Sequence, residues 1–151
     1  MRIVLDTNIL VSALLVGDSA GTAPRRVLRH CLEGRVVPLM GAALYAEYED
    51  VLARDDLFAR SPLSRADREA VFDALMSACL WTPVYYLWRP NLPDAGDDHL
   101  VELALAGGAE WIVTANVRDL DRGELRFDHL AIGTAGDFLD RHDAADQEKT
   151  P

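Results

Sequence analysis

The sequence predicts an α/β fold, specifically a three-layer α/β/α sandwich with a mostly parallel central sheet. Short apolar segments of strand character alternate along the chain with longer segments of helical periodicity. The first of them, Arg2–Leu5, is dominated by a continuous apolar run, as expected for a strand buried on both faces. With 50% hydrophobic residues, a chain of 151 residues has enough apolar side chains for the core of one domain.

The next two elements are expected to be helices. Ile9–Val16 is apolar enough to form a buried helix that ends near Gly17. Arg25–Glu33 lies between Pro24, at a first helical position, and Gly34, a typical helix stop.

The middle of the chain is expected to continue the alternation. Val36–Met40 is predicted to be a strand near an edge of the sheet or at a bulge, because Pro38 lacks a backbone donor. Two helices follow over Gly41–Arg54 and Ser64–Leu80, the second opened by a Ser-Arg-Ala-Asp capping-box pattern. Thr82–Leu87 is rich in residues that favour strands.

The last third is expected to complete the domain. Asp97–Ala106 has a strong helical pattern closed by two glycines, and Trp111–Thr114 and Leu130–Ile132 are short predicted strands. A last helical turn is expected around Ala135–Asp140. The domain therefore spans residues 1–140, and the polar segment 141–151 is expected to be a disordered tail.

Composition excludes several classes of protein. The formal net charge of −10 argues against broad electrostatic binding of nucleic acid. Lys149 is the single lysine, which excludes Schiff-base chemistry and a P-loop phosphate clamp. Two cysteines, Cys31 and Cys79, lie in apolar helical patterns and are expected to be free thiols rather than zinc ligands. No membrane span or signal peptide is expected, so the predicted location is cytoplasmic.

Polar side chains follow two of the predicted strands at the point where each strand ends. They are Asp6, Thr7 and Asn8 after the first strand, and Thr114, Asn116 and Asp119 at the later one. In parallel sheets, ligands bind beyond the carboxyl ends of the strands. Asp6 can also be a simple cap of the following helix, and its position alone leaves both roles open.

Helical phase selects two further acids. In the helix over Gly41–Arg54, Glu47 lies at the edge of the apolar stripe, whereas Glu49 and Asp50 point well away from it. A carboxylate at that edge is costly unless it is paired or bound to a cation. In the helix predicted over Asp97–Ala106, Asp97 is in phase with the apolar stripe, whereas Asp98 falls toward solvent. Asp97 can cap this helix as well as bind a cation, and Asp94 is a weaker candidate.

Converging carboxylates without lysine or cysteine are typical of a site for a hard cation such as Mg²⁺. A pair of such ions can activate water and stabilise the leaving oxygen of a phosphodiester. The histidines show no metal-ligand spacing, and His99 is expected to be a surface residue or to support the acids. The basic run of Arg25, Arg26, Arg29 and Arg35 is expected to be a solvated helix face.

The motifs together resemble a PIN domain over residues 1–140, of the kind found in VapC-type toxins of toxin–antitoxin systems. They are Leu5-Asp6-Thr7-Asn8-Ile9-Leu10, Glu47 with Leu52, Pro93-Asp94 followed by Asp97-Asp98-His99-Leu100 and Glu102-Leu103-Ala104, and Ile112-Val113-Thr114-Ala115-Asn116-Val117-Arg118-Asp119. The resemblance implies a Mg²⁺- or Mn²⁺-dependent endoribonuclease that acts on RNA, is usually a homodimer and is neutralised by a cognate antitoxin protein.

Residue by residue, the resemblance implies catalytic roles for Asp6, Glu47, Asp97 and Asp119. Asp6, Asp97 and Asp119 would bind the metal, and the supporting residues would be Thr7, Asn8, Asp98, Thr114 and Asn116. Two points stay open: whether Asp97 or Asp98 is the third acid, and whether Asn116 binds the metal or orders a water.

Two alternatives are weighed against this interpretation. A haloacid-dehalogenase-type phosphohydrolase also has an aspartate after its first strand, but it requires a second aspartate where this chain has Asn8 and a lysine that is missing here. The second alternative is a catalytically silent PIN-like module that only binds a partner protein.

Overall fold

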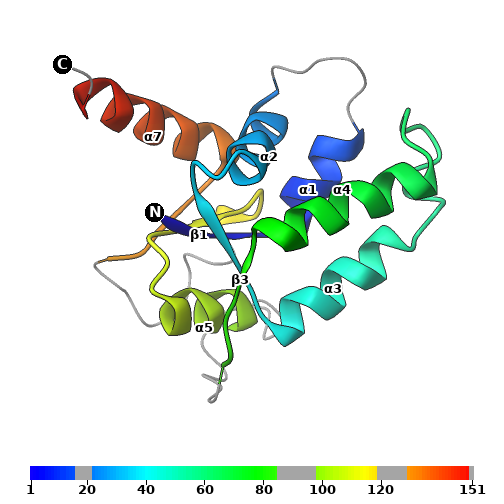
Figure 1. Ribbon diagram of the computed structural model, residues 1–151, viewed down its shortest axis with the longest axis horizontal. Helices are drawn as coiled ribbons and strands as arrows, with labels where there is room; N and C mark the ends of the chain where they lie inside the picture. Colours follow the sequence, from blue (N-terminus) through cyan, green and yellow to red (C-terminus); the bar gives the residue numbers. More distant parts are fainter. Residues whose placement is uncertain (16–21, 85–97, 119–128, 150–151) are drawn as a thin grey trace.

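The computed structural model describes residues 1–15, 22–84, 98–118 and 129–149 (Figure 1). Their strands form one parallel sheet of five strands in the order β3-β2-β1-β4-β5. The strands are β1 (Arg2–Leu5), β2 (Val37–Met40), β3 (Leu80–Trp81), β4 (Trp111–Val113) and β5 (Ala131–Gly133). The predicted α/β class with a parallel sheet is confirmed.

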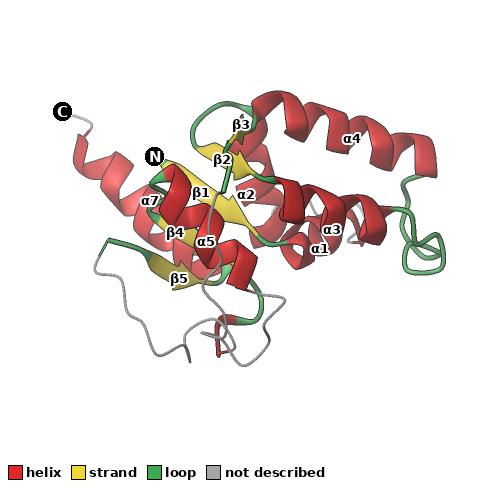
Figure 2. Cartoon of the chain, turned by 90° about the horizontal axis from the view of Figure 1, so that it is seen from below, coloured by secondary structure: helices red, strands yellow, loops and turns green. Residues whose placement is uncertain are grey.

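Helices cover both faces of this sheet. α5 lies on one face, and α1, α2 and α7 lie on the other, as Figures 1 and 2 show from two directions. The helices are α1 (Thr7–Leu15), α2 (Ala23–Leu32), α3 (Ala42–Leu52), α4 (Arg65–Ala78), α5 (Asp98–Gly107) and α7 (Ala135–Lys149).

β1 is the central strand, and its sequence explains that position. Ile3, Val4 and Leu5 are all buried, as both faces of the strand are covered by helices. Ile3 pairs with Trp111 and Leu5 with Val113, so β1 and β4 end at the same level. We call this side of the sheet, where β1, β2 and β4 end, the carboxyl edge.

Local signals set several helix ends as the sequence predicted. Ser64 caps α4 and forms a capping box with Asp67, in which each side chain accepts a hydrogen bond from the other residue's backbone N–H. α2 ends before Gly34, whose φ of 76° lies in the left-handed region that favours glycine. The backbone N–H of Arg35 donates to the carbonyl of His30 and closes this last turn.

One of the two strands expected in the middle of the chain agrees with the prediction and the other differs. β2 was expected near an edge of the sheet, and it is the second strand from the edge, between β3 and β1. Pro38 is tolerated there because β3 pairs only with Leu39 and Met40, so no β3 carbonyl faces the missing donor. β3 is Leu80–Trp81 rather than Thr82–Leu87, and residues 85–87 of that expected strand lie outside the described residues.

The segment from residue 141, expected to be a disordered tail, continues α7 as far as Lys149. The polar composition of the segment suggested disorder, and this prediction was wrong because the contacts that stabilise the helix come from α2. The side chain of His142 is buried and its ring lies 5.3 Å from that of His30, and Arg26 forms an ion pair of 2.8 Å with Asp143.

Among the described residues, no helix is both long enough and apolar enough to cross a membrane.

Candidate active site

Four elements bring polar side chains to the carboxyl edge. Asp6 follows β1 and Thr114 follows β4, while α3 begins two residues after β2 ends. α5 leads into β4 and runs back along the sheet, so its first residues also lie at this edge. The parallel topology therefore gathers residues that are separated by up to about a hundred positions in the sequence.

Asp6 is buried and held by hydrogen bonds from neighbouring segments. Its Oδ2 accepts from Thr114 Oγ1 at 2.7 Å and from Asn8 Nδ2 at 3.2 Å. The same Thr114 oxygen accepts from the backbone N–H of Asn116 at 3.0 Å. Asn8 Oδ1 accepts from the backbone N–H of Ala115. This network locks the loop after β4 onto the start of α1.

Glu47 is half-buried on α3 and has two partners. Thr7 Oγ1 donates to Glu47 Oε1 at 2.7 Å and lies 3.4 Å from Asp6 Oδ1, so one hydroxyl bridges the two carboxylates. His99 Nε2 on α5 lies 2.8 Å from Glu47 Oε2. A hydroxyl and an imidazole thus fix both oxygens of this carboxylate.

The two carboxylates have opposite pKa shifts. Burial raises the pKa of Asp6, with a further increase from the charge of Glu47, against the opposing hydrogen bond from Thr114. The hydrogen bond from His99 lowers the pKa of Glu47, and that from Thr7 acts in the same direction although burial opposes them. Glu47 is therefore ionised at neutral pH, whereas ionised Asp6 is destabilised by its surroundings.

Tyr48, next to Glu47, anchors α3 to the end of β1. Its buried hydroxyl donates to the carbonyl of Leu5 at 2.5 Å, and burial raises its pKa well above 10.0, so it stays a donor. Because Leu5 directly precedes Asp6, this bond sets the distance between the two acid-bearing segments.

The comparison with known families fits this arrangement. The sequence model of the PIN domain family matches residues 2–118, which is most of the chain. The chain belongs to the PIN-domain family. No match was found among curated proteins.

The PIN fold is also seen in a solved structure. The structure of the present chain is similar to a crystal structure of VapBC2 from Rickettsia felis bound to a DNA fragment from their promoter, with a TM-score of 0.52 and 14% sequence identity. The alignment covers 87% of this chain and 97% of the other. At this identity the likeness concerns the fold.

The structure brings together part of the predicted acid set of this PIN domain. Asp6 and Glu47 meet at the carboxyl edge with the predicted supporting residues Thr7, Asn8 and Thr114, and Asn116 takes part through its backbone N–H. As helical phase indicated, Glu49 and Asp50 are exposed. Asp94, Asp97 and Asp119 lie outside the described residues, as does the side chain of Asp98.

Two residues of α5 also lie at this end of the PIN domain. His99, expected to be a surface residue or to support the acids, contacts Glu47 with 11% of its side chain exposed, which agrees with the supporting alternative. Glu102, one turn further along α5, is 2% exposed and lines the same small pocket as His99. Helical phase is the sequence signal that could have predicted the burial of both residues, because both positions lie near the apolar stripe of Leu100, Leu103 and Ala104.

Thr114→Val should test how far this network depends on a single hydroxyl. The variant keeps the shape of the side chain but removes the donor to Asp6 and the acceptor for the Asn116 N–H. We expect a loss of about 1–3 kcal/mol in the free energy of unfolding, since buried partners lose their hydrogen bonds. The pKa of Asp6, followed by NMR in the presence of EDTA, should rise further.

The matched control is Thr114→Ser, which retains the hydroxyl. Serine should keep the pKa of Asp6 close to that of the parent, although the lost methyl group costs some stability. Equal Asp6 pKa values in the valine and serine variants would contradict the network.

Proposed function

We propose that this PIN domain is a metal-dependent endoribonuclease and the toxin of a toxin–antitoxin pair. The observation that carries the proposal is the pair Asp6 and Glu47, two carboxylates from separate elements bridged by Thr7 at the carboxyl edge of a PIN fold. The PIN-family match argues against the phosphohydrolase alternative.

The donor set fits a hard divalent cation, Mg²⁺ or Mn²⁺. Asp6, Glu47, Thr114 and the side-chain oxygen of Asn8 offer oxygen atoms only, the ligands that these ions prefer. Burial and the charge of Glu47 disfavour ionised Asp6, and a bound cation would reverse that cost.

We propose that Asp6 holds the cation together with Asp97 and Asp119, and that Glu47 is the remaining catalytic acid. When bound, such an ion lowers the pKa of a water ligand and stabilises negative charge on a phosphodiester. Glu47 stays ionised and oriented by Thr7 and His99, so its carboxylate can accept a hydrogen bond from the attacking water. His99 and Thr7 act as positioning residues.

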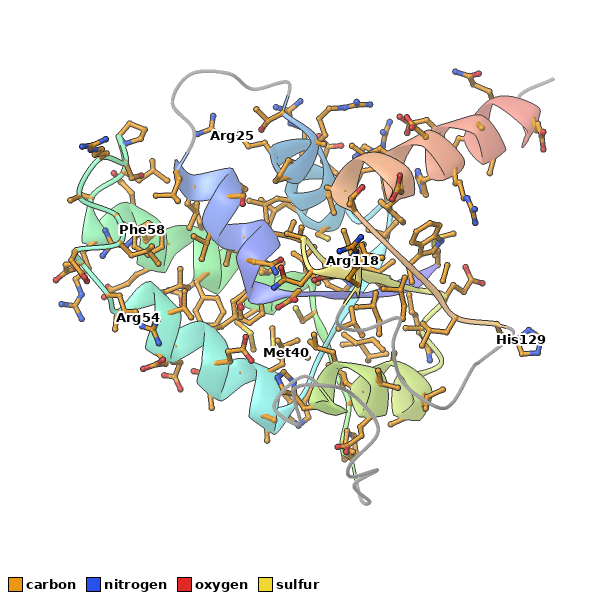
Figure 3. The ribbon with its side chains drawn as sticks, turned by 180° about the vertical axis from the view of Figure 1, so that it is seen from behind. Arg25, Met40, Arg54, Phe58, Arg118 and His129 are labelled. Atoms are coloured by element: carbon orange, nitrogen blue, oxygen red, sulfur yellow. The ribbon has the colours of Figure 1, made fainter. Side chains whose placement is uncertain are left out.

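The proposed substrate is RNA. Because the chain carries a net charge of −10, the bound metal ions rather than a broad basic surface would contact the RNA phosphates. Arg118, an exposed cation shortly after β4, would contribute a local contact to phosphate (Figure 3). A homodimer and a cognate antitoxin complete the proposal. An antitoxin arginine would bind the carboxylates of the site in a bidentate manner and so block it.

Cleavage of a mixed pool of single-stranded RNA by the purified protein tests the proposal. We expect cleavage in Mn²⁺ or Mg²⁺ and none in EDTA, and inhibition when the cognate antitoxin is added. At 10 mM metal and a Kd of about 1 mM, native-state binding should add roughly 1.4 kcal/mol of stability. The absence of both cleavage and any metal-dependent change in melting temperature would overturn the proposal in favour of the silent PIN-like module.

A further inference from the structure

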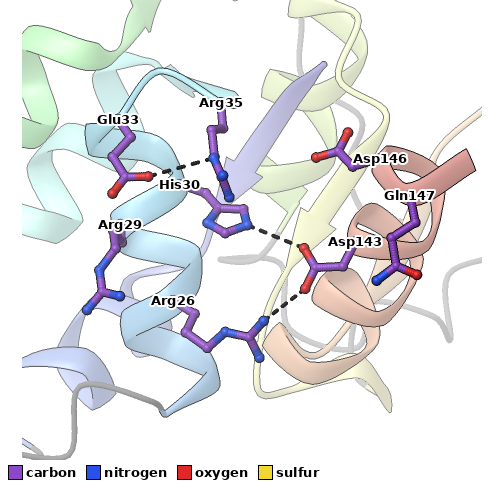
Figure 4. Close-up of a pocket in the computed structure, with 8 residues that line it drawn as sticks. All are labelled: Arg26, Arg29, His30, Glu33, Arg35, Asp143, Asp146 and Gln147. Carbon is purple, nitrogen blue, oxygen red and sulfur yellow. Dashed lines mark hydrogen bonds and ion pairs between the residues drawn. The ribbon is translucent and has the colours of Figure 1, made fainter. Parts of the chain in front are cut away.

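Two buried histidines and one aspartate meet where α7 packs on α2, outside the acid site. They are His30 on α2 and His142 and Asp143 on α7, and one ligand atom from each lies within 4.8 Å of the others. The side chains of His30 and His142 are 7% and 8% exposed, and Asp143 is half-buried. Figure 4 shows the ring of His30 pointing toward Asp143 across the gap between the helices.

Hydrogen bonding among the described residues does not account for this cluster. Both ring nitrogens of His30 and Nδ1 of His142 are buried without a hydrogen-bond partner there. Leaving such atoms unsatisfied costs free energy, and native proteins rarely do so without a reason. Asp143 Oδ1 lies 3.6 Å from His30 Nε2 and 3.7 Å from His142 Nδ1, which is close enough for ion pairs with protonated rings but longer than a well-formed hydrogen bond.

The spacing instead suits three ligands around one ion. Nitrogen and oxygen ligands bind zinc at about 2.0–2.1 Å in tetrahedral sites, which places neighbouring ligand atoms about 3.3–3.4 Å apart. The two separations from Asp143, 3.6 and 3.7 Å, approach that value, and the ligand atoms of the two histidines lie within 4.8 Å of each other.

The second oxygen of Asp143 is already oriented. Arg26 donates to Asp143 Oδ2 at 2.8 Å, which leaves Oδ1 directed at the two imidazoles. Partners of this kind orient carboxylate ligands in metal sites, and a guanidinium on the distal oxygen leaves one oxygen for the ion.

We propose that His30, His142 and Asp143 bind a divalent transition cation of the Zn²⁺ class, and that this ion ties α7 to α2. A water completes the coordination, and Asp146, whose Oδ2 lies 3.6 Å from His142 Nδ1, is placed to accept a hydrogen bond from it. The ion reaches the site through a pocket of about 530 Å³ that His30, Asp143 and Asp146 line from the solvent side.

This site differs from the acid site in place and in chemistry. α2 leads into the beginning of β2, so the end of α2 that carries His30 lies at the opposite edge of the sheet from Asp6. Imidazole ligands favour zinc and related ions, whereas Mg²⁺ requires oxygen ligands. The two sites are therefore expected to take different metals.

Titration of untagged, chelator-treated protein with Zn²⁺, followed by calorimetry, tests the proposal. Asp6→Asn serves as the background, because it weakens any binding at the acid site. We expect one Zn²⁺ per chain at the cluster, and Co²⁺ should give the visible absorption of a tetrahedral complex. At a Zn²⁺ concentration about 100 times its Kd, Tm should rise by about 5–10 °C.

Three variants in that background make the test specific. Asp143→Asn and His142→Gln should each weaken binding at least about 10-fold and remove the Tm increase. His129→Gln is the matched control, because His129 is exposed on the β5 side, away from the cluster (Figure 3). Unchanged isotherms in the Asp143 variant, or a parent that binds no Zn²⁺, would overturn the proposal. Asp143 is a surface-accessible residue, so its variant remains informative if His142→Gln fails to fold.

Discussion

Asp6→Asn should reduce RNA cleavage by more than about 100-fold. Changes to the residues that support metal ligands already cost about 10–100-fold, and this change removes the charge of a proposed ligand itself. The substitution keeps the size of the side chain and an oxygen that can accept from Thr114. Cleavage of single-stranded RNA in Mn²⁺ is the measurement.

The same variant should leave the metal-free protein as stable as the parent or more stable. Burial raises the pKa of Asp6 in the folded state, so ionisation of Asp6 costs stability as the pH rises through that pKa, and the full cost remains at neutral pH. Asparagine carries no charge and removes this cost together with the repulsion from Glu47. Urea unfolding in EDTA at pH 7 measures the difference.

Asp73→Asn is the matched control, since it makes the same chemical change at an exposed position of α4. It should alter neither cleavage nor stability appreciably. If Asp6 were only a helix cap, asparagine would cap equally well and both measurements would stay at parent values. Full cleavage by the Asp6 variant would remove the catalytic assignment.

Phe138→Ala should have the largest effect on stability among the changes considered for α7. The side chain of Phe138 is 0% exposed, packs edge-on against Trp111 with ring centroids 5.5 Å apart, and stacks on His142 at 5.4 Å. Truncation of a buried phenylalanine costs about 3–5 kcal/mol, because apolar contacts are lost and a cavity remains. Such a loss is a large part of the stability of a domain of this size.

Urea denaturation followed by circular dichroism measures this change, and Phe138→Leu is the conservative comparison. Leucine keeps most of the apolar volume, so its loss should be clearly smaller. A decrease below about 1 kcal/mol for the alanine variant would contradict the packing of α7 on β4. Hydrogen exchange adds an independent readout, since the backbone amides of residues 141–147 should be protected in the parent.

The sequence alone was sufficient for the features that depend on neighbouring residues. The apolar run of β1 predicted a buried strand, and the pattern at Ser64 predicted the capped start of α4. Helical phase separated Glu47 from the exposed Glu49 on the same helix. In each case the side chains concerned lie within one or two turns, so periodicity records their burial.

Tertiary structure decided the features that join distant segments. Strand order placed β2 between two partners despite Pro38, and the contact of His99 with Glu47 crosses 52 residues of sequence. The polar residues after Arg141 are helical because α2 offers His30 and Arg26 as partners. Residue patterning shows which face of an element is apolar, but it does not show which element covers that face. That choice depends on packing over the whole chain, and it sets both the acid site and the α2–α7 cluster.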